Sequence, residues 1–265
     1  PVIDLDSGEV AGYEALLRWY HPKRGIVTPD DFLEVAEETG MIVPIGEWVI
    51  RQALAETGQW EGNFRIAINL SPTQVRSPHL ADVVAQAIHA HGIAPHRVEF
   101  EITEHVLMQN SDLCEGNLAK LRELGTKVAL DDFGTGYSSL SCLRTLPIDK
   151  IKIDSSFVLD LHKGGEDALV LLRSIADLGN ALGMTICAEG VETEQQLRIV
   201  RAEGCTEMQG YLVSPPLPAA AMMRWRRPKS LYESWGWLGL PTTGRRWKAS
   251  PAISPGFEVR SLASE

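Results

Sequence analysis

The chain has few cysteines, and none of them lie in a metal-binding or redox spacing. Its 265 residues include Cys114, Cys142, Cys187 and Cys205, and no Cys-x-x-Cys occurs. This argues against a zinc or redox site built on paired cysteines. We interpret the four as small buried hydrophobic residues of a protein in a reducing compartment.

Long apolar runs are also absent. No stretch approaches the roughly 18 apolar residues that a membrane span needs. The first residues show no charged segment followed by an apolar one, as a signal peptide would. We therefore expect a cytoplasmic protein, or the cytoplasmic part of a larger, membrane-bound one.

Positive charge is in short supply, because 25 Lys and Arg residues stand against 35 Asp and Glu, for a net charge of −10. A protein that grips nucleic acid through its phosphates needs a basic face, so no nucleic acid polymer is expected as a partner. A small phosphate substrate is still allowed. Divalent cations between the acids and the phosphate would set the local field.

A Gly-x-Gly-x-x-Gly turn is missing as well, and this absence bears on the fold. Strand-like runs alternate with helical segments, which predicts an α/β protein with a parallel sheet. The expected strands cover 65–70, 97–102, 127–130, 151–153, 184–188 and a last run ending at 208. The expected helices cover 28–40, 44–58, 80–91, 115–124, 166–182 and 193–203.

Two architectures share this alternation. An open doubly wound sheet usually carries its phosphate site on a glycine-rich turn after the first strand, and this turn is the missing motif. A single TIM-like (β/α)8 barrel suits a chain of 265 residues with 44% hydrophobic residues. Acids at the ends of at least five strands favour closure, so we predict the barrel.

Polar side chains recur where the strand-like runs end, and most of them are carboxylates. They are Glu14, Asn69, Glu101, Glu104, Asp131, Asp132, Lys152 and Glu189. The carboxyl ends of parallel strands meet at one end of a barrel, so these side chains are expected to share a site there. That arrangement is typical of a metal-dependent barrel enzyme.

The adjacent Asp131 and Asp132 favour two metal ions. Two uncompensated carboxylates this close would repel, and one would have to take up a proton. Oxygen ligands suit Mg²⁺ or Mn²⁺, and two such ions can clamp the attacking and leaving oxygens of a phosphoryl displacement. Taken alone, the stretch Asp131-Asp-Phe-Gly134 favours an ordinary polar turn over a metal site.

Seven ordered motifs across about residues 1 to 220 resemble the EAL-domain phosphodiesterases. They are Glu14-Ala-Leu16, Asn69-Leu-Ser71, Glu101-Ile-Thr-Glu104, Asp131-Asp-Phe-Gly-Thr-Gly-Tyr-Ser-Ser-Leu140, Lys152-Ile-Asp154, Ala188-Glu-Gly-Val-Glu192 and Gln209-Gly-Tyr211. The resemblance implies a TIM-like barrel that converts the bacterial second messenger cyclic di-GMP to linear pGpG. It also implies Mg²⁺ or Mn²⁺ as cofactor, with two ions per site.

The resemblance further implies roles for single residues. The ligands of the first metal would be Glu14, Asn69, Glu101 and Asp131. Asp131 would also bridge to a second metal, which Asp132 would bind. Lys152 would hold the nucleophilic water and offset charge in the transition state. Glu189 would engage the water or the second metal and act as general base, although a metal-bound water could lose its proton without that help.

Substrate contacts and one loop anchor follow from the same resemblance. The implied substrate-binding residues are Leu16, Arg18, Asp154, Glu192 and Gln209. Glu104 would anchor the loop 133–139, which in the family couples metal binding to dimerisation, so a homodimer is expected. From the residues alone, Arg18 beside Trp19 could equally form a surface stacking pair, and Gln209 could be a plain polar residue at a strand end.

The chain departs from the family pattern at both ends. It begins at Pro1, where the family usually has an upstream helix and a strand ending in Gln, so we expect a fragment with an incomplete first strand region. Residues 1–223 would form the barrel. Residues 224–265 form a basic, Trp-rich extension that could meet a membrane surface or nucleic acid, but that we expect to pack on the barrel, with 250–265 partly disordered. Sensor or cyclase domains absent from this chain would regulate it.

The resulting hypothesis is metal-dependent hydrolysis of cyclic di-GMP. The alternative from another class is a catalytically silent receptor for the dinucleotide, or a protein-interaction module. Intact acids in every matched motif favour the enzyme. A metal-dependent nuclease for longer nucleic acids would need a basic channel that the composition does not indicate.

Overall fold

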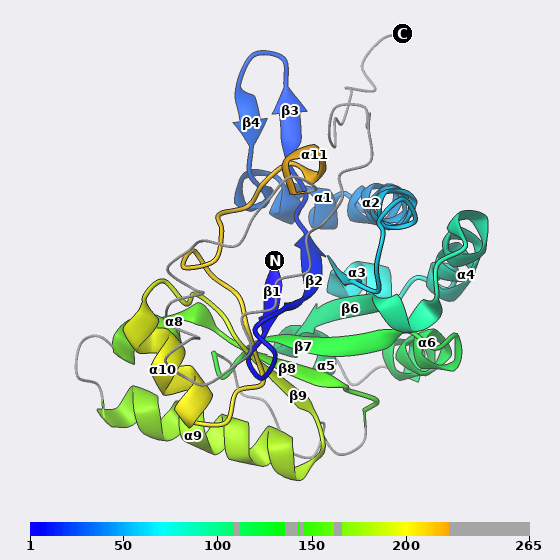
Figure 1. Ribbon diagram of the computed structural model, residues 1–265. Coiled ribbons are helices and arrows are strands. Elements are labelled where there is room, and N and C mark those ends of the chain that lie inside the picture. The colour runs from blue at the N-terminus through cyan, green and yellow to red at the C-terminus, as the bar shows by residue number, and fades with distance from the viewer. Residues whose placement is uncertain (109–111, 136–142, 144–145, 162–165, 223–265) are drawn as a thin grey trace, which may run out of the picture.

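The computed structural model describes residues 1–108, 112–135, 143, 146–161 and 166–222. Within these residues eight strands close into a barrel (Figure 1). Around the barrel the order is β1 (Val2–Asp4), β10 (Glu207–Met208), β9 (Thr185–Ala188), β8 (Lys150–Ile153), β7 (Lys127–Phe133), β6 (Val98–Thr103), β5 (Arg65–Asn69) and β2 (Val10–Ala15). The predicted TIM-like barrel is confirmed.

One strand runs against the others. β1 is antiparallel to both of its neighbours, with Ile3 opposite Met208 and Val2 opposite Gly12, whereas all other pairs in the barrel are parallel. The reason is the short connection from β1 to β2, which is closed by a hydrogen bond from the Asp4 amide to the Glu9 carbonyl at 2.9 Å. A tight turn reverses the chain, while a parallel pair needs a crossover. The all-parallel sheet that we predicted therefore has one exception.

Helices surround the barrel (Figure 1). They are α1 (Leu33–Glu38), α2 (Ile42–Thr57), α3 (Pro72–Val75), α4 (Leu80–His91), α5 (Glu104–Met108), α6 (Asp112–Glu123), α8 (Ser155–Asp160), α9 (Glu166–Ala181), α10 (Glu194–Ala202) and α11 (Ala219–Met222), with 3-10 turns η1 (Pro29–Asp31) and η2 (Pro95–Arg97). The range predicted for α4 is confirmed. Gly92 follows α4 in the left-handed conformation that ends helices.

Three predicted helix starts differ from the structure, and one of them is that of α6, which begins at Asp112 instead of Glu115. α2 begins at Ile42, two residues before the Pro44 that we took as its start. Proline is tolerated there because the first amides of a helix have no acceptor within it. The helix predicted over 28–40 is divided into η1 and α1, since Phe32 leaves the helical conformation (φ −142°) and the Thr28 side chain makes no capping bond.

Apolar packing lies outside the barrel wall, between strands and helices. On β6, Val98, Phe100 and Ile102 join the hydrophobic core. The alternate residues Glu99 and Glu101 are buried as well, and the period of two places them on the inner face. The barrel interior thus holds charged side chains.

A second, two-stranded sheet follows β2. It is a hairpin of β3 (Trp19–His21) and β4 (Gly25–Val27), and it projects beyond the barrel (Figure 1). Trp19 packs edge-on against Phe32, with ring centroids 5.8 Å apart, and so ties the hairpin to the segment before α1. We did not predict this hairpin from the sequence.

Among the described residues no helix is long and apolar enough to cross a membrane. Cys114, Cys187 and Cys205 are free and buried, as we predicted, and Cys142 lies outside the described residues. The extension 224–265 also lies outside them, so its packing on the barrel stays a prediction.

Candidate active site

The strands deliver the predicted polar residues to one end of the barrel. Glu14 lies near the end of β2, Asn69 ends β5, and Glu101 lies on β6. Lys152 lies on β8, and Glu189 directly follows β9. All of these strands run in the same direction, so their side chains meet at one mouth.

Lys152 is at the centre of this group. Its Nζ atom lies 2.7 Å from Glu189 Oε1, 2.9 Å from Glu101 Oε2, 3.0 Å from Asp131 Oδ1 and 3.8 Å from Glu14 Oε2. The Lys152 side chain is only 2% exposed. Carboxylates from four different strands therefore share one buried ammonium group.

Glu14 is held by two side-chain amides. Asn69 Nδ2 donates to Glu14 Oε1 at 2.8 Å, and Gln209 Nε2 donates to Glu14 Oε2 at 2.7 Å. Burial by itself would raise the pKa of Glu14, but Lys152 and these amides lower it below its usual value. Glu14 is therefore ionised and aimed at the site.

Lys152 alone does not offset the negative charge of the other carboxylates around it. Burial and the neighbouring acids raise the pKa of Glu101 well above its ordinary value, despite Lys152. Burial raises the pKa of Glu189 to about 7, with Asp131 adding to the effect and Lys152 opposing it. Burial lowers the pKa of Lys152, but the four surrounding carboxylates, Glu101 foremost, raise it well above normal.

This imbalance fits divalent cations. Glu101 Oε2 and Asp131 Oδ1 are buried and accept no hydrogen bond, and their contact is the ion pair with Lys152. A single ammonium cannot neutralise four carboxylates. The donor set of carboxylate and amide oxygens is the one that Mg²⁺ and Mn²⁺ prefer.

A bulge in β7 brings the adjacent aspartates together. The register between β7 and β8 shifts between Leu130 and Phe133, and Asp132 adopts a left-handed conformation with φ 53°. Aspartate tolerates this conformation better than most residues, and bulges redirect side chains beside active sites. As a result, carboxylate oxygens of Asp131, Asp132 and Glu189 all lie within 4.8 Å of one another, so these three could hold a cation.

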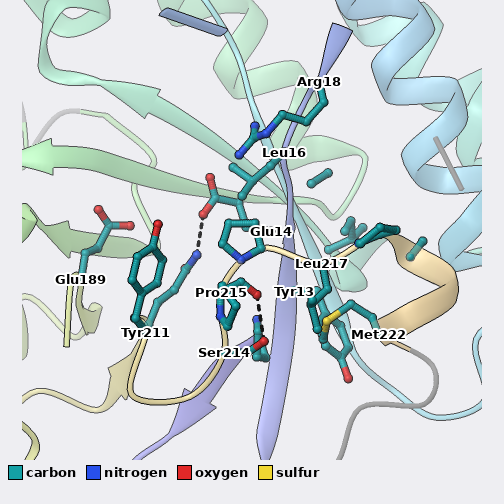
Figure 2. Close-up of a pocket in the computed structure, with 18 of the residues that line it drawn as sticks. Tyr13, Glu14, Leu16, Arg18, Glu189, Tyr211, Ser214, Pro215, Leu217 and Met222 are labelled. Atoms are coloured by element: carbon teal, nitrogen blue, oxygen red, sulfur yellow. Dashed lines mark hydrogen bonds between the residues drawn. The ribbon is translucent and has the colours of Figure 1, made fainter. Parts of the chain in front are cut away.

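A cavity of about 630 Å³ opens above this group. In Figure 2 Glu189 and Tyr211 lie on one side of it, Leu217 and Met222 on the other, and Glu14 between them. Among the predicted residues, those that line it are Glu14, Leu16, Arg18, Asp131, Lys152, Glu189, Glu192 and Gln209. Four of the five predicted substrate contacts, all but Asp154, thus share one cavity with most of the carboxylate group.

Two predicted residues make contacts of another kind. Asp154 does not line this cavity, and its Oδ1 accepts a hydrogen bond from the Ser156 amide at 3.0 Å, which caps α8. Glu104 Oε1 accepts from the Gly134 amide at 2.8 Å. Glu104 therefore contacts the start of the loop that we expected it to anchor, and residues 136–139 of that loop lie outside the described part of the chain.

Sequence reasoning missed part of the cavity wall. Ser214, Leu217 and Met222 line it from the segment after β10, and Tyr211 lines it with 66% of its surface exposed. Tyr211 closes the last of the seven motifs, but the stretch after it contains Pro215, Pro216 and Pro218 and lacks strand or helix periodicity, so no pattern signalled the place of the other three residues.

The fold and the site define a class: barrel proteins with a polar, carboxylate-rich site at the carboxyl ends of the strands. The family model for the EAL domain matches residues 1–216, and the chain belongs to the EAL domain family. The resemblance seen in the motifs is confirmed.

Named relatives carry the same domain. An uncharacterised signalling protein of Caulobacter vibrioides is 46% identical over 225 residues, which is 85% of this chain and 28% of that protein. The cyclic di-GMP phosphodiesterase NbdA of Pseudomonas aeruginosa is 40% identical over 231 residues, 86% of this chain and 29% of that protein. This chain therefore spans less than a third of the length of these two relatives.

A solved structure agrees in fold. The phosphodiesterase PaMucR, in complex with c-di-GMP, superposes with a TM-score of 0.80 at 39% identity, covering 84% of this chain and 91% of that one. At this identity the two chains share both the fold and the family.

Proposed function

We propose that this chain is a cyclic di-GMP-specific phosphodiesterase that hydrolyses the messenger to linear pGpG with Mg²⁺ or Mn²⁺. The observation that carries the proposal is the group of four carboxylates around Lys152 Nζ at the floor of the cavity. Membership of the EAL family supports the choice of substrate, since NbdA is named a cyclic di-GMP phosphodiesterase and PaMucR is a phosphodiesterase solved in complex with c-di-GMP.

Five residues would hold the cations. Glu14, Asn69, Glu101 and Asp131 would bind the first, and Asp131 and Asp132 the second. When bound, the ions would supply Lewis-acid charge to the phosphate and lower the pKa of water. The bulge at Asp132 is the feature of this chain that allows two adjacent aspartates to serve one mouth.

Lys152 and Glu189 would handle the proton and the developing charge. The attacking water forms a new bond to phosphorus, and the bond from phosphorus to the 3′ oxygen breaks, which leaves a 5′-phosphate on pGpG. The Lys152 ammonium lies where it can orient that water and offset negative charge. Glu189 would accept the proton of the water, and a pKa of about 7 in the metal-free protein suits a general base.

The cavity would bind the rest of the dinucleotide. Arg18 lines it and offers a guanidinium group for a phosphate, while its Nη1 donates to the Leu17 carbonyl at 2.7 Å. Leu16, Glu192 and Gln209 line the same space. Asp154 would act from just outside it, by fixing the start of α8 beside the cavity residue Ser155.

The test is incubation of the protein with cyclic di-GMP and Mg²⁺ or Mn²⁺, with pGpG followed by chromatography. We expect product with either ion and none in EDTA. Glu14→Ala and Glu189→Gln should each abolish turnover. As a matched control, Glu123→Ala removes an exposed carboxylate on α6 that belongs to none of the motifs and does not line the cavity, and it should leave turnover unchanged.

Tight binding of cyclic di-GMP without product would contradict the proposal and indicate a receptor. Cleavage of longer nucleic acids at a comparable rate would indicate a nuclease.

The wider setting is also a proposal. Residues 1–223 would act as one domain with 224–265 as an extension, and two copies would form a homodimer. Sensor or cyclase domains outside this chain would regulate it, which the much greater length of the relatives supports. Its place of action would be the cytoplasm.

A further inference from the structure

A second group of buried charges lies inside the barrel beneath the site. Lys150 Nζ is 2.5 Å from Glu99 Oε1 and 2.9 Å from Glu207 Oε2, and Arg65 pairs with Glu207. The side chains of Lys150, Glu99 and Glu207 are 4%, 4% and 5% exposed. We call these four residues the lower layer.

The lower layer is in register with the site. Glu99 precedes Glu101 by two residues on β6, Lys150 precedes Lys152 by two on β8, and Glu207 precedes Gln209 by two at the end of β10. Side chains two residues apart on a strand point to the same face, about 6.6 Å apart. Each of these three strands therefore places one side chain in the lower layer, and the side chain two residues further along the chain in the site.

Small side chains leave room for this stacking. The strand residues Ala67, Ala129 and Cys187 are buried but lie apart from the hydrophobic core outside the wall. TIM barrels usually fill this space with bulky branched residues. Here the space is filled by charged chains reaching inward.

Cys187 reports how closely the two layers approach. It pairs in register with Lys152 on one side and with Glu207 on the other. Burial is the main reason why its pKa lies well above normal, and charges of both layers also act on it: Glu207 and Lys150 from below, Glu189 and Lys152 from above. Burial is the largest cause of the raised pKa of Glu101 in the site, and Glu99 of the lower layer adds to it, so charge in one layer acts on the other.

The two layers differ in net charge. Arg65 and Lys150 balance Glu99 and Glu207, so the lower layer has no net formal charge. In the site Lys152 stands against the four carboxylates that it contacts, with Asp132 as a fifth beside them. The lower layer also faces a separate cavity of about 770 Å³ at the opposite end of the barrel. It is a neutral partition between that cavity and the site.

We propose that the lower layer is a positioning layer, which fixes Lys152 and Glu101 from beneath and, through its neutrality, sets the affinity of the site for divalent cations. The inference rests on the proposed cation site. A neutral lower layer does not reduce the attraction of the site carboxylates for cations. It also adds no negative charge that would repel those carboxylates from beneath. Changing the charge of the layer in either direction must then change cation affinity in opposite directions.

The test is a calorimetric titration of metal-free protein with Mn²⁺, so it does not depend on turnover. Glu99→Gln leaves the layer with an extra positive charge and should weaken Mn²⁺ binding, on the order of ten-fold for a unit charge in a partly buried setting. Lys150→Met leaves it negative and should tighten binding by a similar factor. The double variant Glu99→Gln/Lys150→Met restores neutrality and should bind close to wild type.

If one of these variants fails to fold, a substitution at a more exposed position of the lower layer still tests the proposal. Arg65 is 28% exposed, and Arg65→Gln also leaves the layer negative, so it should tighten Mn²⁺ binding. The matched control is Lys127→Met, which removes a positive charge at the same end of the barrel. Lys127 is 44% exposed and pairs with Asp149, so solvent screens it and binding should not change.

The outcomes separate the two proposals. Shifts of opposite sign, cancelling in the double variant, support the positioning layer. Weaker binding in both single variants would mean that the layer only supports the fold, and the inference would be overturned while the cation site stood. If wild-type protein does not bind Mn²⁺ at all, the proposed function fails and this inference fails with it.

Discussion

Lys152 makes its shortest ion pair with Glu189, with Nζ 2.7 Å from Oε1. The pair joins β8 to the end of β9, and it lies at the floor of the cavity. The same ammonium also contacts Glu101 and Asp131, so in the metal-free protein it links β8 to β6 and β7 at the mouth of the barrel. The predictions below follow from this shared ammonium and from the buried acids around it.

Replacing Lys152 by methionine should reduce turnover of cyclic di-GMP by about a hundredfold or more, because one preorganised cationic donor in an active site contributes that much. It should also lower the unfolding temperature of the metal-free protein, since unpaired buried carboxylates then repel. Turnover assays and thermal unfolding in EDTA check both. Lys127→Met, at an exposed lysine, serves as the control. Full activity of Lys152→Met would show that Lys152 has no role in the reaction.

The stability of the metal-free protein should fall as pH rises from about 4.5 to about 7. Burial raises the pKa of Glu189 from its ordinary value of 4.5 to about 7 in the folded state, so across this window the folded state keeps a proton that the unfolded state loses. The integrated effect of Glu189 is about 3 kcal/mol. Urea unfolding in EDTA at several pH values measures it, with Glu189→Gln as the reference.

The contribution of Glu189 appears as the difference between wild type and that variant. The variant cannot ionise at position 189, so its stability relative to wild type should grow between pH 4.5 and 7 and level off above. A constant difference across this range would show that Glu189 has an ordinary pKa.

Removing the Glu104 carboxylate should weaken cation binding. Its Oε1 accepts from the Gly134 amide, two residues after Asp132, and Gly134 has φ 102°, which favours glycine. Losing this bond frees the chain after the bulge, and such supporting contacts typically change metal affinity by about 10- to 100-fold. In a Mn²⁺ titration Glu104→Ala should bind weakly and Glu104→Gln, which keeps an acceptor, should recover most of the affinity. Equal loss in both would point to the negative charge instead of the hydrogen bond.

The buried thiols should resist alkylation in the folded protein. Burial raises the pKa of Cys205 to about 12 and, with Glu207, raises that of Cys187 well above normal, so neither forms thiolate near neutral pH. Iodoacetamide at pH 8 followed by peptide mapping should show little label on either residue until denaturant is added. Rapid labelling of Cys187 in native protein would contradict a closed barrel interior.

Much of the barrel could be predicted from the sequence because its strands end in polar residues and its helices end in glycine. Arg65–Asn69 and Leu80–His91 show these two signals plainly, and both elements form as expected. β1 could not be found in this way, since Val2–Asp4 is only three residues long and its pairing with β10 depends on Met208, far along the chain. The bulge at Asp132 is likewise a product of pairing with β8.

The gathering of the predicted site residues follows from their strand ends, but the lower layer was missed although the sequence carries its signal. Glu99 and Glu101 alternate with Phe100, as Lys150 and Lys152 do with Ile151. Side chains alternate between the two faces of a strand, so the two glutamates must point to the same face of β6 and the two lysines to the same face of β8. A strand in which apolar residues alternate with acids or lysines therefore predicts a charged barrel interior. We overlooked this pattern because we considered only the residues at the strand ends.

The account depends most directly on cations held between the carboxylates at the barrel mouth. The most direct measurement is anomalous diffraction from crystals soaked in Mn²⁺. We predict two peaks about 3.5 to 4 Å apart, one among Glu14, Asn69, Glu101 and Asp131 and the other beside Asp132. Well-diffracting soaked crystals with no peak at these residues, or with Mn²⁺ bound only elsewhere, would contradict the account.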